Sequence, residues 1–129
     1  MDTKWKYVHP TTLSNINDIE HLTSFCIPAS LKAIILKYNN GRPEKCLFNT
    51  RTGIEREFKQ LLSFNIDDIE NIYIFINLFD KIKLFPFADD PAGNLICLDG
   101  ESVVFWEHET ETVDFIAESV DDFFNSLFN

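Results

Sequence analysis

The last 46 residues of the chain, after Lys83, contain no lysine and no arginine. All eleven basic residues lie in the first 83 positions with ten of the 21 acidic residues, so this part is close to neutral. Nearly the whole net charge of −10 therefore belongs to the C-terminal third. Such a charge is repelled by nucleic-acid phosphates and by anionic membrane surfaces, which argues against both as partners. It suits a basic protein partner, although the same acids would also keep a domain with 13 Phe residues soluble.

Cysteine is scarce, and its three positions form no pattern. Cys26, Cys46 and Cys97 are an odd number, and no pair has the spacing of a metal site or a redox motif. Cys26 and Cys97 lie in apolar runs, so we expect them to pack as small hydrophobic side chains in a reducing compartment. The first residues include no apolar stretch that would form a signal peptide, and no window is long enough to span a bilayer. The chain is therefore expected to be cytoplasmic.

The residue patterns that carry out catalysis are missing as well. The four glycines stand apart, so none forms a phosphate-binding loop, and no nucleophile elbow or Cys/His signature is present. Glu107, His108 and Glu109 end an expected strand, where alternation directs His108 away from the two carboxylates. This opposes a compact metal site, and a general base would need a positioned partner. We expect no enzyme, and neither a cofactor nor a metal.

What the chain does have is enough apolar residues for the core of one domain. Hydrophobic residues make up 45% of its 129 positions, which supports a single core rich in aromatic rings. Apolar residues at helical spacing predict helices, with Ser119 as an N-cap for the last and Asn39-Asn40-Gly41 as the end of the second. Gly41 is expected to adopt the left-handed backbone that follows a helix. The expected helices cover residues 12–22, 28–38, 67–79 and 120–128.

Apolar alternation predicts an antiparallel sheet in the second half. Residues 94–98 and 103–106 are apolar on both faces, as in central strands, and Asp99-Gly100 between them is typical of a tight hairpin. Helices followed by a sheet and a closing helix define an α+β domain. The other expected strands are 45–49, 57–64 (which also fits a helix), 85–88 and 112–116.

Some conspicuous residues have alternative roles. Asp89 and Asp90 adjoin an expected turn, where carboxylates accept hydrogen bonds from backbone amides, but they could instead bind a cation or a basic partner. Trp106 lies in an apolar run and is expected in the core. Trp5 lies in a polar segment that is expected to be irregular, so it is the better candidate for a surface anchor.

Several segments together resemble a known family. Residues Ile27-Pro28-Ala29-Ser30-Leu31, followed by Leu36-Lys37-Tyr38-Asn39-Asn40-Gly41, resemble the "leucine-proline … asparagine-glycine" helix of the SUKH superfamily of Smi/Knr-type proteins. Residues 85–99 are similar to its central signature, 103–109 to the following strand and 116–127 to the closing strand and helix. The resemblance runs from about Ile16 to Leu127. Ile27 replaces the usual leucine, a second glycine is missing after Gly41, and residues 46–83 match little.

The resemblance implies an α+β domain without catalytic residues. Many bacterial members of the superfamily are immunity proteins that neutralise a cognate toxin, in several cases a nuclease, whereas a fungal branch is associated with cell-wall assembly and signalling. We therefore expect a stoichiometric inhibitor, a monomer or homodimer, whose toxin partner is basic. The alternative is a non-enzymatic regulatory or scaffold module. The residues expected to contact the partner are acids at turns and strand ends: Asp89, Asp90, Glu107, Glu109 and Glu111.

Overall fold

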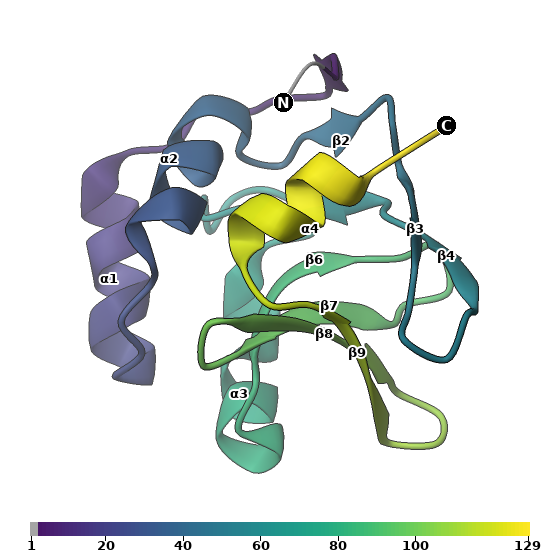
Figure 1. The fold of residues 1–129 in the computed structure, drawn as a ribbon. Coiled ribbons are helices and arrows are strands. Elements are labelled where there is room, and N and C mark those ends of the chain that lie inside the picture. The colour runs from purple at the N-terminus through teal and green to yellow at the C-terminus, as the bar shows by residue number, and fades with distance from the viewer. Residues whose placement is uncertain (1–2) are drawn as a thin grey trace.

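The computed structural model describes residues 3–129, which form an α+β domain as the sequence predicts (Figure 1). Two helices open the domain, a sheet forms its second half and a short helix closes it. The helices are α1 (Leu13–Thr23), α2 (Ala29–Tyr38), α3 (Ile76–Ile82), which follows the 3-10 turn η1 (Ile72–Phe75), and α4 (Val120–Ser126). The strands are β1 (Trp5–Lys6), β2 (Arg42–Pro43), β3 (Leu47–Asn49), β4 (Glu55–Glu57), β5 (Gln60–Leu61), β6 (Phe85–Asp89), β7 (Leu95–Asp99), β8 (Ser102–Glu107) and β9 (Thr112–Ala117).

The main sheet is an antiparallel meander in the order β5-β6-β7-β8-β9, and two small pairs, β1-β2 and β3-β4, flank it. The expected hairpin is confirmed, because Asp99 pairs with Ser102 across a two-residue turn in which Gly100 has φ of 63°. In a meander, successive connections fall at opposite ends of the sheet. The β6–β7 and β8–β9 turns lie at one end, which we call the His108 end. The β7–β8 turn and the β9–α4 connection lie at the other, which we call the α4 end.

A β-bulge divides the aromatic core between the two faces of this sheet. Residues two apart in a strand normally share a face, but the register of β6 against β7 shifts between Pro86 and Ala88. Phe85 therefore stacks on Phe25 beside α3, with 4.6 Å between ring centroids, whereas Phe87 contacts Phe123 of α4 at 6.2 Å. Helices α3 and α4 lie on opposite sides of the sheet (Figure 1). Residues 95–98 of β7 are buried throughout, as expected for a central strand.

Helix α4 is capped as its sequence predicts. The Ser119 hydroxyl accepts the N–H of Asp122 at 3.1 Å. Asp121 and Asp122 lie in the first turn, where their negative charges interact favourably with the positive end of the helix dipole. Val120, Phe123 and Phe124 are buried against the sheet. Burial of a phenylalanine side chain contributes about 1.5–3 kcal/mol, so this face holds the helix in place.

The helix predicted at residues 67–79 is wrong over its first half, because α3 begins only at Ile76. Residues 66–70 form turns, in which polar side chains bond the local backbone instead of continuing a helix. The amide of Asn71 donates to the carbonyls of Ile66 and Asp68 at 3.2 and 2.9 Å. Ile69, which a helix over residues 67–79 would place on the same apolar face as Ile72 and Ile76, is 92% exposed.

The single strand predicted at 57–64 is also wrong. Strand β4 ends at Glu57 and pairs with β3, whereas β5 begins at Gln60 and pairs with β6. Between them Phe58 is completely buried and packs against Phe123 and Phe124. The strand breaks because this ring must enter the core.

The structure corrects the expected environments of two residues, Trp5 and Cys26. Trp5 is half-buried rather than a surface anchor, because pairing of β1 with β2 brings its indole onto Tyr38, with 4.5 Å between ring centroids. Cys26 is exposed, not packed as a small hydrophobic residue. Cys97 is buried as expected, and burial raises the pKa of its thiol. Residues 1 and 2, which belong to the N-terminal segment expected to be irregular, lie outside the described residues.

Gly41, which follows α2, has no room for a Cβ atom. Asn40, not Gly41, has the left-handed backbone, with φ of 68°. A Cβ at Gly41 would lie 2.6 Å from the Tyr38 carbonyl oxygen and 2.9 Å from the Trp5 ring. The position therefore excludes any side chain.

Gly41→Ala is expected to lower the free energy of unfolding by about 2 kcal/mol or more, because the backbone must move away from the new methyl group. Urea denaturation measures the change. Gly53→Ala is the matched control: Gly53 has φ of 85°, but a Cβ added there would meet no non-adjacent atom of residues 3–129 within 4 Å, so only backbone strain of about 1 kcal/mol applies. A loss at Gly41 no larger than at Gly53 would contradict the steric explanation.

Candidate functional site

The meander brings together the five acids that the sequence singles out. Asp89 pairs with Leu95, Leu95 with Trp106, and Trp106 with Val113, so these residues form one row across the His108 end. Asp90 and Glu107, Glu109 and Glu111 lie at or beyond this row in the two adjacent turns. Their surroundings, however, separate them into buried and exposed groups.

Asp90 organises the β6–β7 turn and is only 6% exposed. Its Oδ1 accepts the backbone N–H groups of Ala92 at 3.0 Å and Asn94 at 2.7 Å, and its Oδ2 accepts the Asn94 side-chain amide at 3.1 Å. The structure thus gives this carboxylate the turn-forming role. It is not available to a partner in this conformation.

His108 joins the two turns of this end. Its backbone N–H donates to Oδ1 of Asn94 at 3.1 Å, and its Nε2 lies 3.1 Å from the carbonyl oxygen of Ala92. The imidazole is therefore occupied in bridging the β6–β7 and β8–β9 turns. These two contacts give His108 a structural role in the computed fold.

Asp89 is a buried acid that lies beside the partly exposed carboxylate of Glu70. It is 8% exposed and adjoins Glu70, whose carboxylate accepts Lys59 Nζ and Gln60 Nε2, each at 2.7 Å. The pKa of Asp89 is raised to about 8, first by burial and then by the hydrogen bond and charge of Glu70, while the charge of Lys59 opposes the shift. The pKa of Glu70 is lowered, because bonds from Lys59, Asp89 and Gln60 outweigh its burial. A raised pKa on Asp89 beside a lowered pKa on Glu70 favours a protonated Asp89 that hydrogen-bonds the Glu70 carboxylate.

Asp89→Asn is expected to remove a pH dependence of stability. The ordinary pKa of aspartate is 3.8, so between about pH 4 and pH 8 the folded chain binds a proton that the unfolded chain has lost. Wild-type stability therefore falls as pH rises through this window. Asparagine can donate to Glu70 without titrating, so the variant should be more stable at pH 8, by on the order of 1–3 kcal/mol.

Urea denaturation at pH 5, 7 and 8.5 measures this difference, with Glu109→Gln as the exposed control, which should follow wild type. If Asp89→Asn lost stability with rising pH as steeply as wild type does, the proton would not reside on Asp89.

The remaining acids of the His108 end are accessible. Glu107 forms a half-exposed ion pair with Arg56 at 3.4 Å, and Glu111 forms an exposed pair with Lys81 at 3.7 Å. Glu109 is exposed and has no ion pair within residues 3–129. Two of the three accessible carboxylates thus already face a cation, although such surface pairs contribute only about 0–1 kcal/mol each.

Sequence reasoning missed a second acidic group at the opposite end of the sheet. Its members are exposed, and within residues 3–129 none forms an ion pair: Asp99, Glu101, Glu118, Asp121 and Asp122. They come from the β7–β8 turn, the β9–α4 connection and the first turn of α4. The strand order alone could have found them, because alternate turns of a meander gather at the same end. The five acids chosen from the sequence all lie at the other end.

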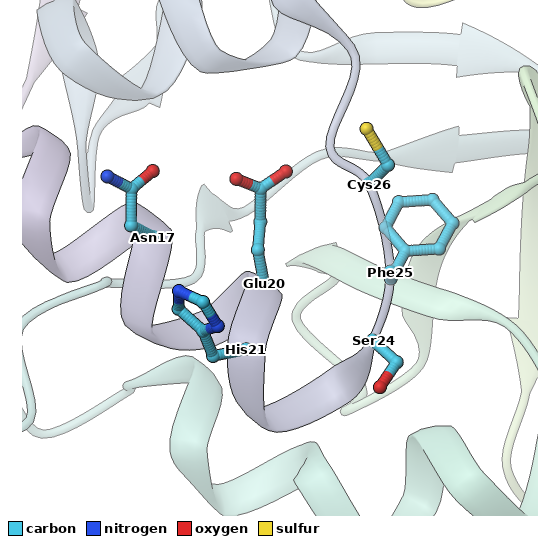
Figure 2. Close-up of a pocket in the computed structure, with 6 residues that line it drawn as sticks. All are labelled: Asn17, Glu20, His21, Ser24, Phe25 and Cys26. Atoms are coloured by element: carbon cyan, nitrogen blue, oxygen red, sulfur yellow. The ribbon is translucent and has the colours of Figure 1, made fainter.

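A hollow of about 320 Å³ lies beside α1. Figure 2 shows Asn17, Glu20 and His21 projecting from this helix, and Ser24, Phe25 and Cys26 coming from the segment that follows it. Glu20 accepts the N–H of Ile27 at 2.8 Å and pairs with Lys32 at 3.0 Å; these bonds outweigh burial and lower its pKa. The Glu20 carboxylate therefore connects α1 with α2. Among residues 3–129, no three His, Cys, Asp or Glu side chains are grouped so that they could hold a metal ion.

These features define an α+β domain whose accessible chemistry is carboxylate groups at turns. The model of the SMI1 / KNR4 family (SUKH-1) matches residues 10–126, so the chain belongs to this family, which is known for immunity-type proteins. No curated protein matches the chain. In the described part of the chain, no helix is both long and apolar enough to cross a membrane.

Proposed function

We propose that the chain is an immunity protein that neutralises a basic cognate toxin by stoichiometric binding. Family membership supports this function, and one observation carries the proposed mode of binding. Six exposed acids of the C-terminal third have no ion pair within residues 3–129: Asp99, Glu101, Glu109, Glu118, Asp121 and Asp122. A cationic surface is the electrostatic complement of these carboxylates.

The domain suits inhibition by occupancy of the partner's surface. A nuclease needs a cationic surface to attract phosphates, and a protein carboxylate surface can compete for it. Hydrogen bonds hold the segments that carry the acids: the backbone N–H of His108, next to Glu109, donates to Asn94, and the N–H of Asp122 donates to the Ser119 cap. Little conformational freedom is then lost on binding, which favours affinity. In this proposal Glu107, Glu109 and Glu111 contribute accessible charge, whereas Asp89 and Asp90 support the turns.

Titration of toxin activity tests the proposal. The protein encoded by the gene next to that of this chain would be purified and its activity measured while the chain is added. We expect activity to fall linearly and to reach its minimum at one equivalent, because each inhibitor molecule occupies one partner. Heat-denatured chain is the control.

Two outcomes would contradict this proposal. Inhibition by far less than one equivalent would indicate that the chain acts catalytically. A stable complex without loss of activity would favour the regulatory or scaffold module instead.

A further inference from the structure

A groove of about 430 Å³ lies at the α4 end, between the edge strand β9 and helix α4. It is larger than the hollow beside α1. In Figure 1, β9 and α4 follow one another at this side of the sheet, with the β3–β4 hairpin beyond β9. The residues that matter for binding are Phe115, Ile116, Glu118, Asp122, Ser126 and Phe128.

The apolar part of the groove is fixed in place. Phe128 exchanges two backbone hydrogen bonds with Leu47, each of 2.9 Å, which attach the chain end to β3. The Phe115 carbonyl accepts the N–H of Arg51 at 2.7 Å, and the Arg51 guanidinium lies 4.1 Å from the centre of the Phe115 ring. Phe115, Ile116 and Phe128 are all partly exposed. The groove therefore offers a preformed apolar floor that solvent reaches.

The charge of the groove specifies what could fill it. Glu118 and Asp122 line it, and the exposed acids Asp99, Glu101 and Asp121 lie at the same end of the sheet. Arg51 is the cation placed against this floor, on the side of the β3–β4 turn. Acids therefore outnumber bases around the opening.

We propose that this groove is the docking site for a cationic segment of a protein partner. Lysine or arginine side chains of that segment face Glu118 and Asp122, and one apolar side chain covers Phe115, Ile116 and Phe128. A second copy of this chain is a poor occupant, because it carries a net charge of −10 and would bring further carboxylates to the same place. This inference rests on the proposed function in one respect: it assumes that the partner docking here is the toxin.

Position-specific photocrosslinking in the native cells tests the site. Benzoylphenylalanine would replace Ser126 in the groove, Glu109 at the His108 end, or Ile69, the 92% exposed residue in the turns before α3. We expect position 126 to give a single adduct with a protein that carries a basic surface. Position 69 is the control for crosslinking that results from exposure alone, and it should give no adduct.

The outcomes separate this inference from the proposed function. No adduct at 126, or equal adducts at 126 and 69, would overturn the docking site. An adduct at 109 alone would also overturn it, and if the adduct were the toxin, the proposed function would survive. A basic protein other than a toxin, captured at 126, would support the groove and contradict the immunity role.

Charge reversal provides a second measurement on the captured partner. Glu118→Lys with Asp122→Lys should weaken the equilibrium affinity about tenfold or more, whereas Glu109→Lys with Glu111→Lys should weaken it less. Asp122 also lies in the first turn of α4, so Glu118→Lys alone is included as a variant outside the helix, and circular dichroism checks the fold. An effect at the His108 end equal to that at the groove would contradict the proposed location.

Discussion

The register of the antiparallel strands β6 to β9 is the constraint on which the other features depend. The shift between Pro86 and Ala88 sends Phe85 and Phe87 to opposite faces, so one sheet is covered by α3 on one side and by α4 on the other. The same register assigns every connection to one of two ends. It thereby divides an acid-rich C-terminal third, which looks continuous in the sequence, into two separate groups.

The residues that carry the family resemblance mostly have structural roles. Asn39 is buried, and its side chain donates to the carbonyl of His9 and the hydroxyl of Ser63 while accepting the N–H of Phe64. Asp90 and Asn94 do the same for the β6–β7 turn. Buried polar groups that are fully bonded specify one arrangement of the backbone. In this chain, therefore, these residues fix the scaffold.

Much of the fold could be predicted from the sequence because its signals are local. Ser119 as a cap and Asp99-Gly100 as a turn depend on neighbouring residues, and both were confirmed. Residues 57–71 could not be predicted. The position of Phe58 depends on packing against Phe123, which is far away in the sequence, and the side chain of Asn71 bonds the turn instead of continuing a helix.

In the candidate site, too, local features could be predicted from the sequence and long-range contacts could not. The turn-forming role of Asp90 follows from its neighbours, whereas the burial of Asp89 against Glu70 joins residues far apart in the sequence. The strand order could have gathered the acids of the α4 end into one group. That they are exposed and lack ion pairs is a property of the assembled sheet, which only the structure shows.

The central claim is that exposed carboxylates of the C-terminal third recognise a cationic partner. The most direct test is the ionic-strength dependence of the association rate between the chain and its purified partner. Salt screens interactions between exposed charges, with a Debye length of about 10 Å at 0.1 M and about 3 Å at 1 M. The association rate is expected to fall steeply as salt is raised over this range. A rate that stays constant would contradict the central claim.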